Sequence, residues 1–529
     1  MNPANRLLRE TRLAIARMPR LRGRVPEAPA LPVRDSWPGD PARGARLLRG
    51  ELETQGVAIP LAPGAWGNAK GPLGAMAHGF AWLRDLRALG TDAARSRARA
   101  LVADWMTLPQ TGLSRRADVT GSRIAAWLGH YDFIAASADD AFRARLMTRL
   151  VADAHGLAAA LPTPPQDERG LTALKGLIAA AVALPDQQAF MLRALRFLPE
   201  EIARQVLPDG CHVERSPAAQ LAALQDLTEI RALLQASQTQ PPVSLGAAIE
   251  RMAPALRTLR HGDGGLALFN GTKEEQTGLI DLALAQAGRG GRAPSGLPEG
   301  GFHRLQAGRT VLIADCGAPP PRGTDRLAHA GTLSFELSVG RERLVTNCGG
   351  APLGGTTWHD AARATAAHST LVIADTNSSE LRREGLGRRP AHVEAQRQEA
   401  NGAHWLETHH DGYAKPFGAI HRRRLYVSET GEDIRGEDQV EADKPLPFAV
   451  RFHLHPLVQA TMQGETVMLR LPSGGTWQVR ADGLPLALEE SVYLGGNAVR
   501  RTEQLVLAST PSPDGAPPHQ VRWAISRTA

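Results

Sequence analysis

The residues of this chain with the clearest chemical potential are two histidines, His329 and His368, each placed before an alternating or apolar run. The first precedes Leu333–Val339, whose period of two is typical of a half-buried strand, and the second precedes the strand signal Ser369–Ile373. Neighbouring antiparallel strands would bring the two imidazoles together. Paired imidazoles are a common beginning of a metal site, so the pattern favours one here. Buried histidines that hydrogen-bond and brace a sheet are the alternative.

A second set of candidates lies in residues 208–217, PDGCHVERSP, directly before a helical pattern. The Asp-Gly pair is a turn signal, and Ser216 has the residue type of a helix N-cap, with proline at the first helical position. His212 and Glu214 alternate, so their side chains share one face if the segment is extended. Histidine acts as a base or an acid near neutral pH, which makes His212 a catalytic candidate. A turn packed by hydrogen bonds is the alternative.

A third set lies in residues 409–423, HHDGYAKPFGAIHRR. His410 precedes a glycine turn, Tyr413 lies on that turn, and His421 begins the next strand signal. A tyrosine on a loop can serve as an acid or a base, and imidazoles on the adjoining strands can contact a substrate. An ordinary hairpin loop is the alternative.

Candidate sugar-binding side chains lie in two further places. Arg123, Trp127 and His130 follow one another at helical spacing, so one helix face carries a cation, an aromatic ring and an imidazole. Trp358 and Arg363 precede the second histidine of the metal candidate and offer a stacking face and a carboxylate clamp. For the helix, a contact with Trp127 in the core is the alternative.

The spacing of apolar residues changes once along the chain, and this change predicts which elements position the candidate residues. Residues 1–65 are predicted to form an arm with a basic helix, and residues 66–290 show helical spacing interrupted by Pro, Gly and Asp breaks. After the Gly/Pro-rich segment 287–301, residues 291–529 show a period of two with regular turn signals. Helices first and strands second predict an α+β multidomain protein, a helical array or toroid followed by an antiparallel β-sandwich.

The charge and composition of the chain limit the classes of partner that we expect. The chain has 529 residues, with 61 Lys+Arg against 54 Asp+Glu and a net charge of +7. A basic balance suits an acidic partner such as a polyanionic polysaccharide, a nucleic acid or an anionic membrane, and a solvated arginine-rich surface is the alternative. The sequence shows no nucleic-acid motif and no apolar run near the roughly 18 residues of a membrane span, so we expect neither. The 3 cysteines include no CxxC pair, and we expect no disulfide framework.

The N-terminal segment 1–23, MNPANRLLRETRLAIARMPRLRG, is basic, and arginines interrupt its apolar residues. It lacks the continuous apolar core of a secretory signal. We interpret it as an amphipathic helix that lies on a surface, either that of the protein or that of a membrane. On sequence alone the expected localisation is cytoplasmic.

Three of these segments together resemble a known family. The pattern HAGTLSFEL at 329–337, NCG at 347–349 and R-x-T-x-A-H-S-T-L at 363–371 is similar to the start of the β-domain of the heparinase II/III family of polysaccharide lyases. The segments 209–217 and 410–423 also resemble that family. The resemblance implies an incomplete (α/α) toroid followed by a β-sandwich. Members are usually periplasmic or envelope-associated, which leaves the localisation of this chain open.

The resemblance also implies an activity, the cleavage of an acidic, uronate-containing glycan by β-elimination. The proton beside the uronate carboxylate is too weakly acidic to leave until that carboxylate is neutralised, after which a base removes the proton and an acid protonates the leaving oxygen. We expect His212, Arg363 and Tyr413 in these roles, beside Glu214. The expected substrate-binding residues are Arg123, Trp127, His130, Trp358, His410 and His421. The expected ligands of a structural zinc are His329, Asn347 and His368.

The sequence departs from the family pattern at several of these positions. Leu327 stands where the family has a cleft histidine, Gly331 where it has an acidic residue, and Ala219 where it often has a tyrosine. Asn347 replaces an aspartate ligand, and an amide is a poor zinc ligand, whereas the thiolate of the adjacent Cys348 would be a good one.

Two alternatives to a lyase therefore stay open. The first is a non-catalytic glycan-binding or envelope protein, which the replaced positions favour. The second is a glycan hydrolase in which Glu214 forms a carboxylate pair with Asp411 or Glu336. Product mass separates hydrolysis, which adds water, from elimination, which does not.

Overall fold

The structure is a computed structural model that describes residues 25–528, apart from 69, 111, 164–168, 289–290, 353–356 and 510–518. The chain divides into two compact units. We call Met1–Gln205 with Ala223–Ile249 the helical unit, and Val206–Ala222 with Glu250–Ala529 the β unit. This division differs from the predicted boundary at 290, because the turn at 206–222 and residues 250–290 group with the strands. The predicted basic helix at the N-terminus lies outside the described residues.

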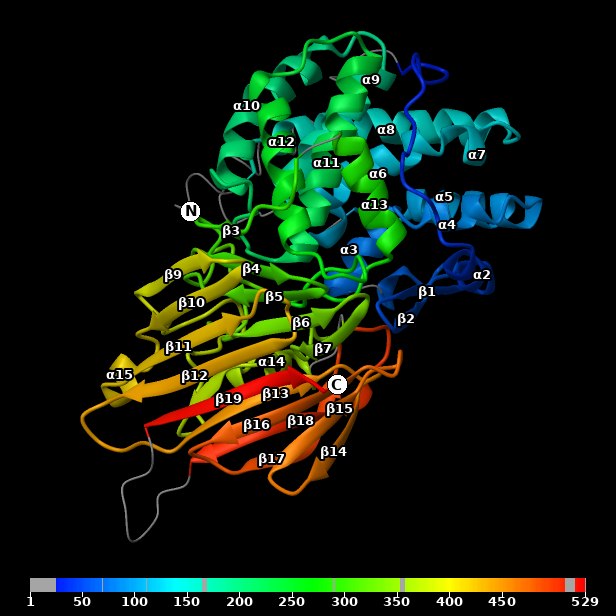
Figure 1. Ribbon diagram of the computed structural model, residues 1–529. Helices are drawn as coiled ribbons and strands as arrows, with labels where there is room; N and C mark the ends of the chain where they lie inside the picture. The colour runs from blue at the N-terminus through cyan, green and yellow to red at the C-terminus, as the bar shows by residue number, and fades with distance from the viewer. Residues whose placement is uncertain are drawn as a thin grey trace. The chain divides into compact units, whose positions relative to one another are not determined.

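The helical unit is built from helices that follow one another along the chain (Figure 1). Its helices are α2 (Pro41–Arg49), α3 (Gly71–Gly79), α4 (Leu83–Ala88), α5 (Asp92–Thr107), α6 (Ala117–Gly129), α7 (Tyr131–Ala135), α8 (Asp140–Ala160), α9 (Gly170–Ala183), α10 (Gln188–Gln205), most of α11 (Pro217–Ala236) and the start of α12 (Val243–Thr258), with the short helices η2 (Trp66–Asn68) and η3 (Gly112–Arg115). One antiparallel hairpin, β1 (Glu51–Thr54) and β2 (Val57–Pro60), lies in the predicted arm.

Local sequence explains where these helices begin and how closely they pack. The side chains of Thr91 and Asp139 accept hydrogen bonds from backbone N–H groups in the first turns of α5 and α8, as N-caps do. Helices α6 and α9 meet at Gly121 and Gly176, where a Cβ on Gly176 would lie 2.3 Å from the Cα of Gly121. Only glycine permits this approach.

The β unit contains two antiparallel sheets. Its strands are β3 (Gly296–Leu297), β4 (Phe302–Ala307), β5 (Thr310–Asp315), β6 (Phe335–Val339), β7 (Glu342–Thr346), β8 (Leu371–Ile373), β9 (Val393–Ala400), β10 (Ala403–His410), β11 (Ile420–Val427), β12 (Asp433–Glu441), β13 (Phe448–Leu454), β14 (Gln459–Gln463), β15 (Thr466–Arg470), β16 (Thr476–Asp482), β17 (Leu486–Tyr493), β18 (Arg500–Ser509) and β19 (Gln520–Arg527). Its helices are α13 (Thr277–Ala287), α14 (His359–Arg363), η4 (Thr365–Ala367) and α15 (Ala414–Phe417), together with the start of α11 and the end of α12.

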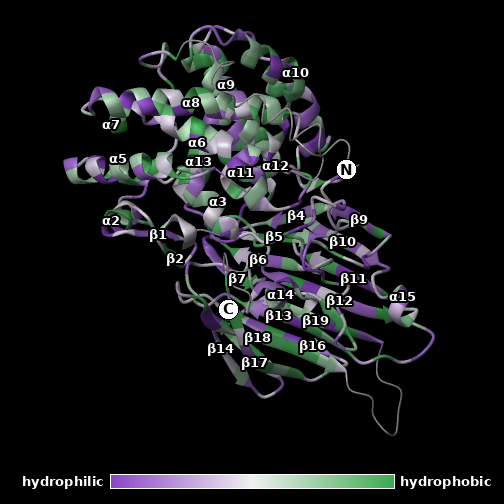
Figure 2. Cartoon of the chain, turned by 180° about the vertical axis from the view of Figure 1, so that it is seen from behind, coloured by the Kyte–Doolittle hydropathy of each residue, from purple (hydrophilic) through white to green (hydrophobic). Residues whose placement is uncertain are grey.

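The first sheet has the strand order β14-β15-β16-β19-β12-β11-β10-β9, and the second has β17-β18-β13-β7-β6-β5-β4-β3, with β8 paired to β13. Along the strands hydrophobic residues are interspersed with hydrophilic ones, which Figure 2 shows as green and purple bands on the ribbon. The apolar faces of both sheets form one core that includes Phe335, Leu425, Phe452, Trp477 and Trp523. The predicted α+β fold, helices followed by an antiparallel sandwich, is confirmed. Among the described residues no helix has the length and apolarity that a membrane crossing requires.

Candidate functional site

The loop that carries His212 is held by its own side chains and by the start of α11. The Asp209 carboxylate accepts hydrogen bonds from the backbone of Cys211, Glu299 and Gly300, which closes the predicted turn. The backbone N–H of His212 donates to Gln220 Oε1 at 2.6 Å, and its Nδ1 accepts from the N–H of Glu214 at 3.3 Å.

His212 and Glu214 lie together, as the sequence predicts, with 3.9 Å between Nδ1 and Oε1. The His212 side chain is buried, and burial lowers its pKa to about 4. The ring is therefore neutral at pH 7, and its Nδ1 lone pair is engaged by the backbone. The predicted N-cap is supplied differently, because Ala218 N–H donates to the hydroxyl of Thr272.

Asn270 joins this loop to the segment that carries His329. Its Nδ2 donates to the carbonyl of Arg215 at 2.8 Å, and its Oδ1 accepts from the N–H of His329 at 3.0 Å. Asn270 has a φ of 45°, in the left-handed region that asparagine tolerates better than most residues. The bridge fixes His329 beside the loop of His212 within the β unit.

His329 and His368 are in direct contact. Nδ1 of His329 lies 2.9 Å from Nε2 of His368, and Nδ1 of His368 lies 2.8 Å from the carbonyl oxygen of Ala364. A carbonyl only accepts, so His368 carries its proton on Nδ1 and accepts at Nε2. His329 then carries its proton on Nδ1, and its Nε2 holds a free lone pair. No hydrogen bond to this Nε2 is present among the described residues.

Both rings of this pair are neutral at pH 7. Burial, followed by the neighbouring His368 and Arg363, holds the pKa of His329 well below its usual range. Burial lowers the pKa of His368 to about 4. The ring of His368 fits because residue 331 is glycine, where a Cβ would lie 2.5 Å from Cδ2 of His368.

The predicted zinc ligands do not form a matching donor set in this arrangement. The two imidazoles are bonded to each other, while Asn347 Oδ1 accepts from Ser369 N–H and its Nδ2 donates to Glu336. Burial raises the pKa of the Cys348 thiol to about 12, so the neighbouring sulfur is not a thiolate at pH 7. No group of three His, Cys, Asp or Glu residues in the described part of the chain is placed to hold a metal. The zinc stays a prediction.

Comparisons with known proteins decide the family. Residues 130–287 match the family model described as Heparinase II/III N-terminus, and residues 289–524 match Heparinase II/III-like, C-terminal. The chain belongs to the heparinase II/III family. A relative, "FtsZ-localized protein C" of Caulobacter vibrioides, is 32% identical over 539 residues, which cover 96% of this chain and 92% of the relative.

Solved structures of heparinase II/III-type lyases and of a chondroitin lyase share the fold. Heparinase III matches with a TM-score of 0.71 at 15% identity, over 85% of this chain and 76% of that one. The heparan sulfate lyase HepC of Pedobacter heparinus matches with a TM-score of 0.61 at 16% identity, over 98% and 88%. The chondroitin AC lyase of Streptomyces coelicolor A3 matches with a TM-score of 0.57 at 11% identity, over 92% and 78%.

In this heparinase II/III family chain the guanidinium of Arg363 binds the chain's own backbone, which corrects its expected role as a substrate clamp. Its guanidinium donates to three backbone carbonyls, those of Ala328 at 3.0 Å, Arg382 at 2.9 Å and Gly385 at 2.6 Å. The side chain is only 2% exposed. A guanidinium with this many engaged donors ties three loops together and leaves little for a carboxylate ligand. Trp358 is half-buried and is the N-cap residue that precedes α14.

Tyr413, His410 and His421 are fully buried in the sandwich, which corrects their expected roles at a substrate. The hydroxyl of Tyr413 donates to the carbonyl of Leu371 at 3.1 Å, and burial raises its pKa. His421 lies 2.8 Å from Asp438, which also binds Arg423, and 3.4 Å from His410. These residues form a satisfied buried polar network.

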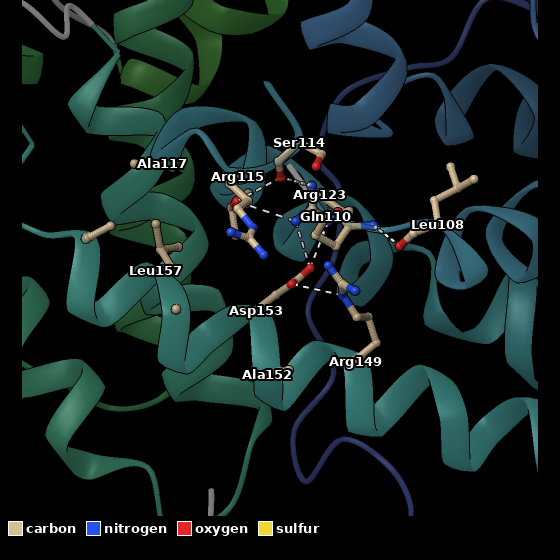
Figure 3. A pocket seen from close by; sticks show the side chains of 13 residues that line it. Leu108, Gln110, Ser114, Arg115, Ala117, Arg123, Arg149, Ala152, Asp153 and Leu157 are labelled. Atoms are coloured by element: carbon tan, nitrogen blue, oxygen red, sulfur yellow. Dashed lines mark hydrogen bonds and ion pairs between the residues drawn. The ribbon is translucent and has the colours of Figure 1, made fainter. Parts of the chain in front are cut away.

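The expected sugar-binding residues of α6 belong to the interior of the helical unit. Trp127 is fully buried and packs edge-on against Phe80 and Trp105, so the core alternative holds for it. His130 lies 3.0 Å from the carboxylate of Asp35. Arg123 is held by Asp153 at 2.8 Å and by the carbonyl of Ser114, and it lines a cavity (Figure 3).

Sequence reasoning missed Lys273, in the segment FNGTKEE that also contains Asn270. The side chain is 3% exposed, and burial lowers its pKa despite the carboxylate of Glu274 beside it. No hydrogen bond to its ammonium is present among the described residues. A buried lysine is rare, and the Asn-Gly turn next to Lys273 was the signal that would have drawn attention to this loop.

Proposed function

We propose that this protein cleaves an acidic, uronate-containing glycan by β-elimination, with His329 as the base. The observation that carries this proposal is the free Nε2 lone pair of His329, fixed by the chain of hydrogen bonds from His329 through His368 to the Ala364 carbonyl. A general base must be unprotonated at the working pH and held in one orientation. The lowered pKa of His329 meets the first condition, and the bond to His368 meets the second.

The chemistry also needs a positive group at the uronate carboxylate. Lys273 is the best candidate, because it is a buried cation in the loop whose Asn270 binds the backbone of His329. A partly desolvated ammonium stabilises the negative charge that develops on the carboxylate as the adjacent proton leaves. It takes the place that sequence reasoning assigned to Arg363.

In the proposed step His329 Nε2 takes the proton from the carbon beside the carboxylate. The electron pair of that C–H bond forms the new carbon–carbon double bond, and the bond to the glycosidic oxygen breaks. The leaving oxygen takes a proton from the His329 imidazolium or from water. No water is added, so the products are a new reducing end and an unsaturated uronate.

Binding without cleavage is a second candidate function, and a specific set of observations favours it. Arg363 and Tyr413 are engaged by backbone carbonyls, and Leu327, 41% exposed, stands where the family has a cleft histidine. The 32% identical relative is named for its localisation with FtsZ. If this chain shares that localisation, it would hold an acidic glycan at the cell-division site. A fluorescent fusion tests the localisation, which would appear as a mid-cell band.

The two functions are separated by incubating the protein with a panel of acidic glycans. A lyase produces the absorbance of an unsaturated uronate and fragments whose masses sum to that of the intact chain. A hydrolase produces fragments heavier by one water and no such absorbance. Retention on a glycan column without either product supports the binding function and contradicts the lyase.

A further inference from the structure

The helical unit contains a cavity whose lining resembles that of a binding site. A cavity of about 310 Å³ is bounded by η3, the start of α6 and the second half of α8. Its lining includes the guanidinium-bearing residues Arg115, Arg123 and Arg149, together with Asp153 and Gln110. Figure 3 shows the three arginine side chains around the Asp153 carboxylate. The cavity contains none of the residues assigned to β-elimination above.

The charges that line this cavity do not balance. Arg123 binds Asp153 Oδ2 at 2.8 Å, and Arg149 binds Oδ1 of the same carboxylate at 3.0 Å. Both guanidiniums also lie over the ring of Trp105, at 4.3 and 4.9 Å from its centroid. One carboxylate therefore serves two arginines, and a third arginine in the lining adds a further positive charge.

Arg115 is the member of this set that is available to a ligand. It is exposed, and within the described part of the chain no hydrogen bond or ion pair engages its guanidinium. The adjacent Arg116 is different, because its guanidinium pairs with the carboxylate of Asp118. In the lining that the structure describes, three arginines accompany one carboxylate, that of Asp153, so the formal charge of the lining is +2.

One polar atom in the lining, Oε1 of Gln110, has no hydrogen-bond partner within the described ranges of the chain. Gln110 donates from Nε2 to the carbonyl of Leu108 at 3.0 Å, which directs its Oε1 away from that carbonyl. This Oε1 is buried, and no donor to it is present among the residues that the structure describes. A buried acceptor without a donor costs free energy, and a hydroxyl or N–H group of a ligand would satisfy it.

We propose that this cavity binds a small oxyanion ligand, with the anionic group between Arg115 and Arg149 and a hydroxyl donating to Gln110. Planar guanidiniums bind carboxylate, sulfate and phosphate groups through paired hydrogen bonds, and excess positive charge selects for an anion. A cavity of about 310 Å³ has room for one acidic monosaccharide or a comparable molecule, not for a polymer segment. The inference does not depend on the proposed lyase activity.

Calorimetric titration of the full chain at constant ionic strength tests this site. The ligands are inorganic phosphate, sulfate, glucuronate and, as a neutral control, glucose. Arg115→Gln removes the exposed guanidinium without disturbing a contact in the described structure. Arg145→Gln is the matched control, because Arg145 is an exposed arginine on the same helix as Arg149 and does not line the cavity.

We expect at least one of the oxyanions to bind the wild-type chain and glucose not to bind. Loss of one charged hydrogen-bonding partner should weaken that binding by about tenfold or more in Arg115→Gln. The Arg145→Gln protein should bind as the wild type does. Tightest binding of glucuronate would identify an acidic sugar, and tightest binding of phosphate or sulfate a phosphorylated or sulfated molecule. No oxyanion binding, or equal affinity in both variants, would overturn the site.

Discussion

Nδ1 of His329 and Nε2 of His368 lie 2.9 Å apart, so the protonation pattern of one ring depends on that of the other. Because His368 also bonds to the carbonyl of Ala364, the proton positions follow in sequence and leave Nε2 of His329 as an acceptor. The same two histidines that suggest a metal site in the sequence thus form, in the structure, a hydrogen-bonded pair that orients the ring of His329.

The buried histidines of the β unit should make stability depend on pH in the acid range. Burial lowers the pKa of His368 to about 4 and that of His453 to about 3, whereas in the unfolded chain both titrate near 6.5. The unfolded state takes up protons first as the pH falls. The free energy of unfolding should therefore be level above about pH 6.5 and fall between pH 6.5 and 4, by about 1.4 kcal/mol for each unit of pKa difference.

Urea titrations at several pH values measure this dependence of the free energy of unfolding on pH. His368→Gln should flatten the slope, while the exposed His392→Gln should not, and equal slopes in all three proteins would contradict the assignment.

Replacing Arg363 should destabilise the protein rather than remove a catalytic group. In Arg363→Gln three backbone carbonyls lose their donor, and the hydrogen bonds to two of them, those of Ala328 and Gly385, are buried, so we expect a cost of about 3 kcal/mol or more. Arg382→Gln is the control, because that side chain is 56% exposed and forms only an exposed ion pair. Its loss should cost less than about 1 kcal/mol. Urea unfolding of both variants provides the comparison. An Arg363→Gln protein as stable as the control would refute the structural role.

Removing the hydroxyl of Tyr413 should have a small effect on stability and none on turnover. Tyr413→Phe leaves the buried ring in place and deletes one hydrogen bond to the Leu371 carbonyl, which should cost about 1 kcal/mol. Thermal unfolding and glycan cleavage are measured on the same preparation. A fully folded Tyr413→Phe protein without activity would show that the hydroxyl reaches the substrate after all.

A zinc ion should bind far better once the third donor is a carboxylate. Asn347→Asp restores the residue type that the family has at this position, and carboxylates are much better zinc ligands than amides. Adding zinc should raise the melting temperature of Asn347→Asp and leave that of the wild type unchanged. Stoichiometric zinc in the purified wild-type chain, measured by mass spectrometry, would instead establish the site that the sequence predicts.

The fold was accessible from sequence because it depends on local periodicity. The helical spacing predicted within 66–290 becomes helices such as α9, and the alternation in 333–339 becomes β6, whose apolar side chains lie in the sandwich core. The proximity of His329 and His368 was also predicted. The contact itself is made by a loop before β6 and the end of η4, not by paired strand positions.

The roles of individual site residues were less accessible, because burial depends on segments distant in sequence. The donors of Arg363 are engaged by the carbonyls of Ala328, Arg382 and Gly385, and no local pattern reveals such partners. Tyr413 has the sequence context of an exposed hairpin loop, yet its ring is in the core. Lys273 was missed because a lysine in a turn is ordinarily solvated, whereas this one is buried.

The most direct measurement compares glycan cleavage by the wild type, His329→Ala and His392→Ala, each followed through the absorbance of the unsaturated uronate. With His329 as the base, cleavage by His329→Ala should fall by at least about 100-fold and recover in part when imidazole is added, while His392→Ala stays at the wild-type rate. Cleavage by His329→Ala at the wild-type rate, or no cleavage of any acidic glycan by the wild type, would contradict β-elimination with His329 as the base.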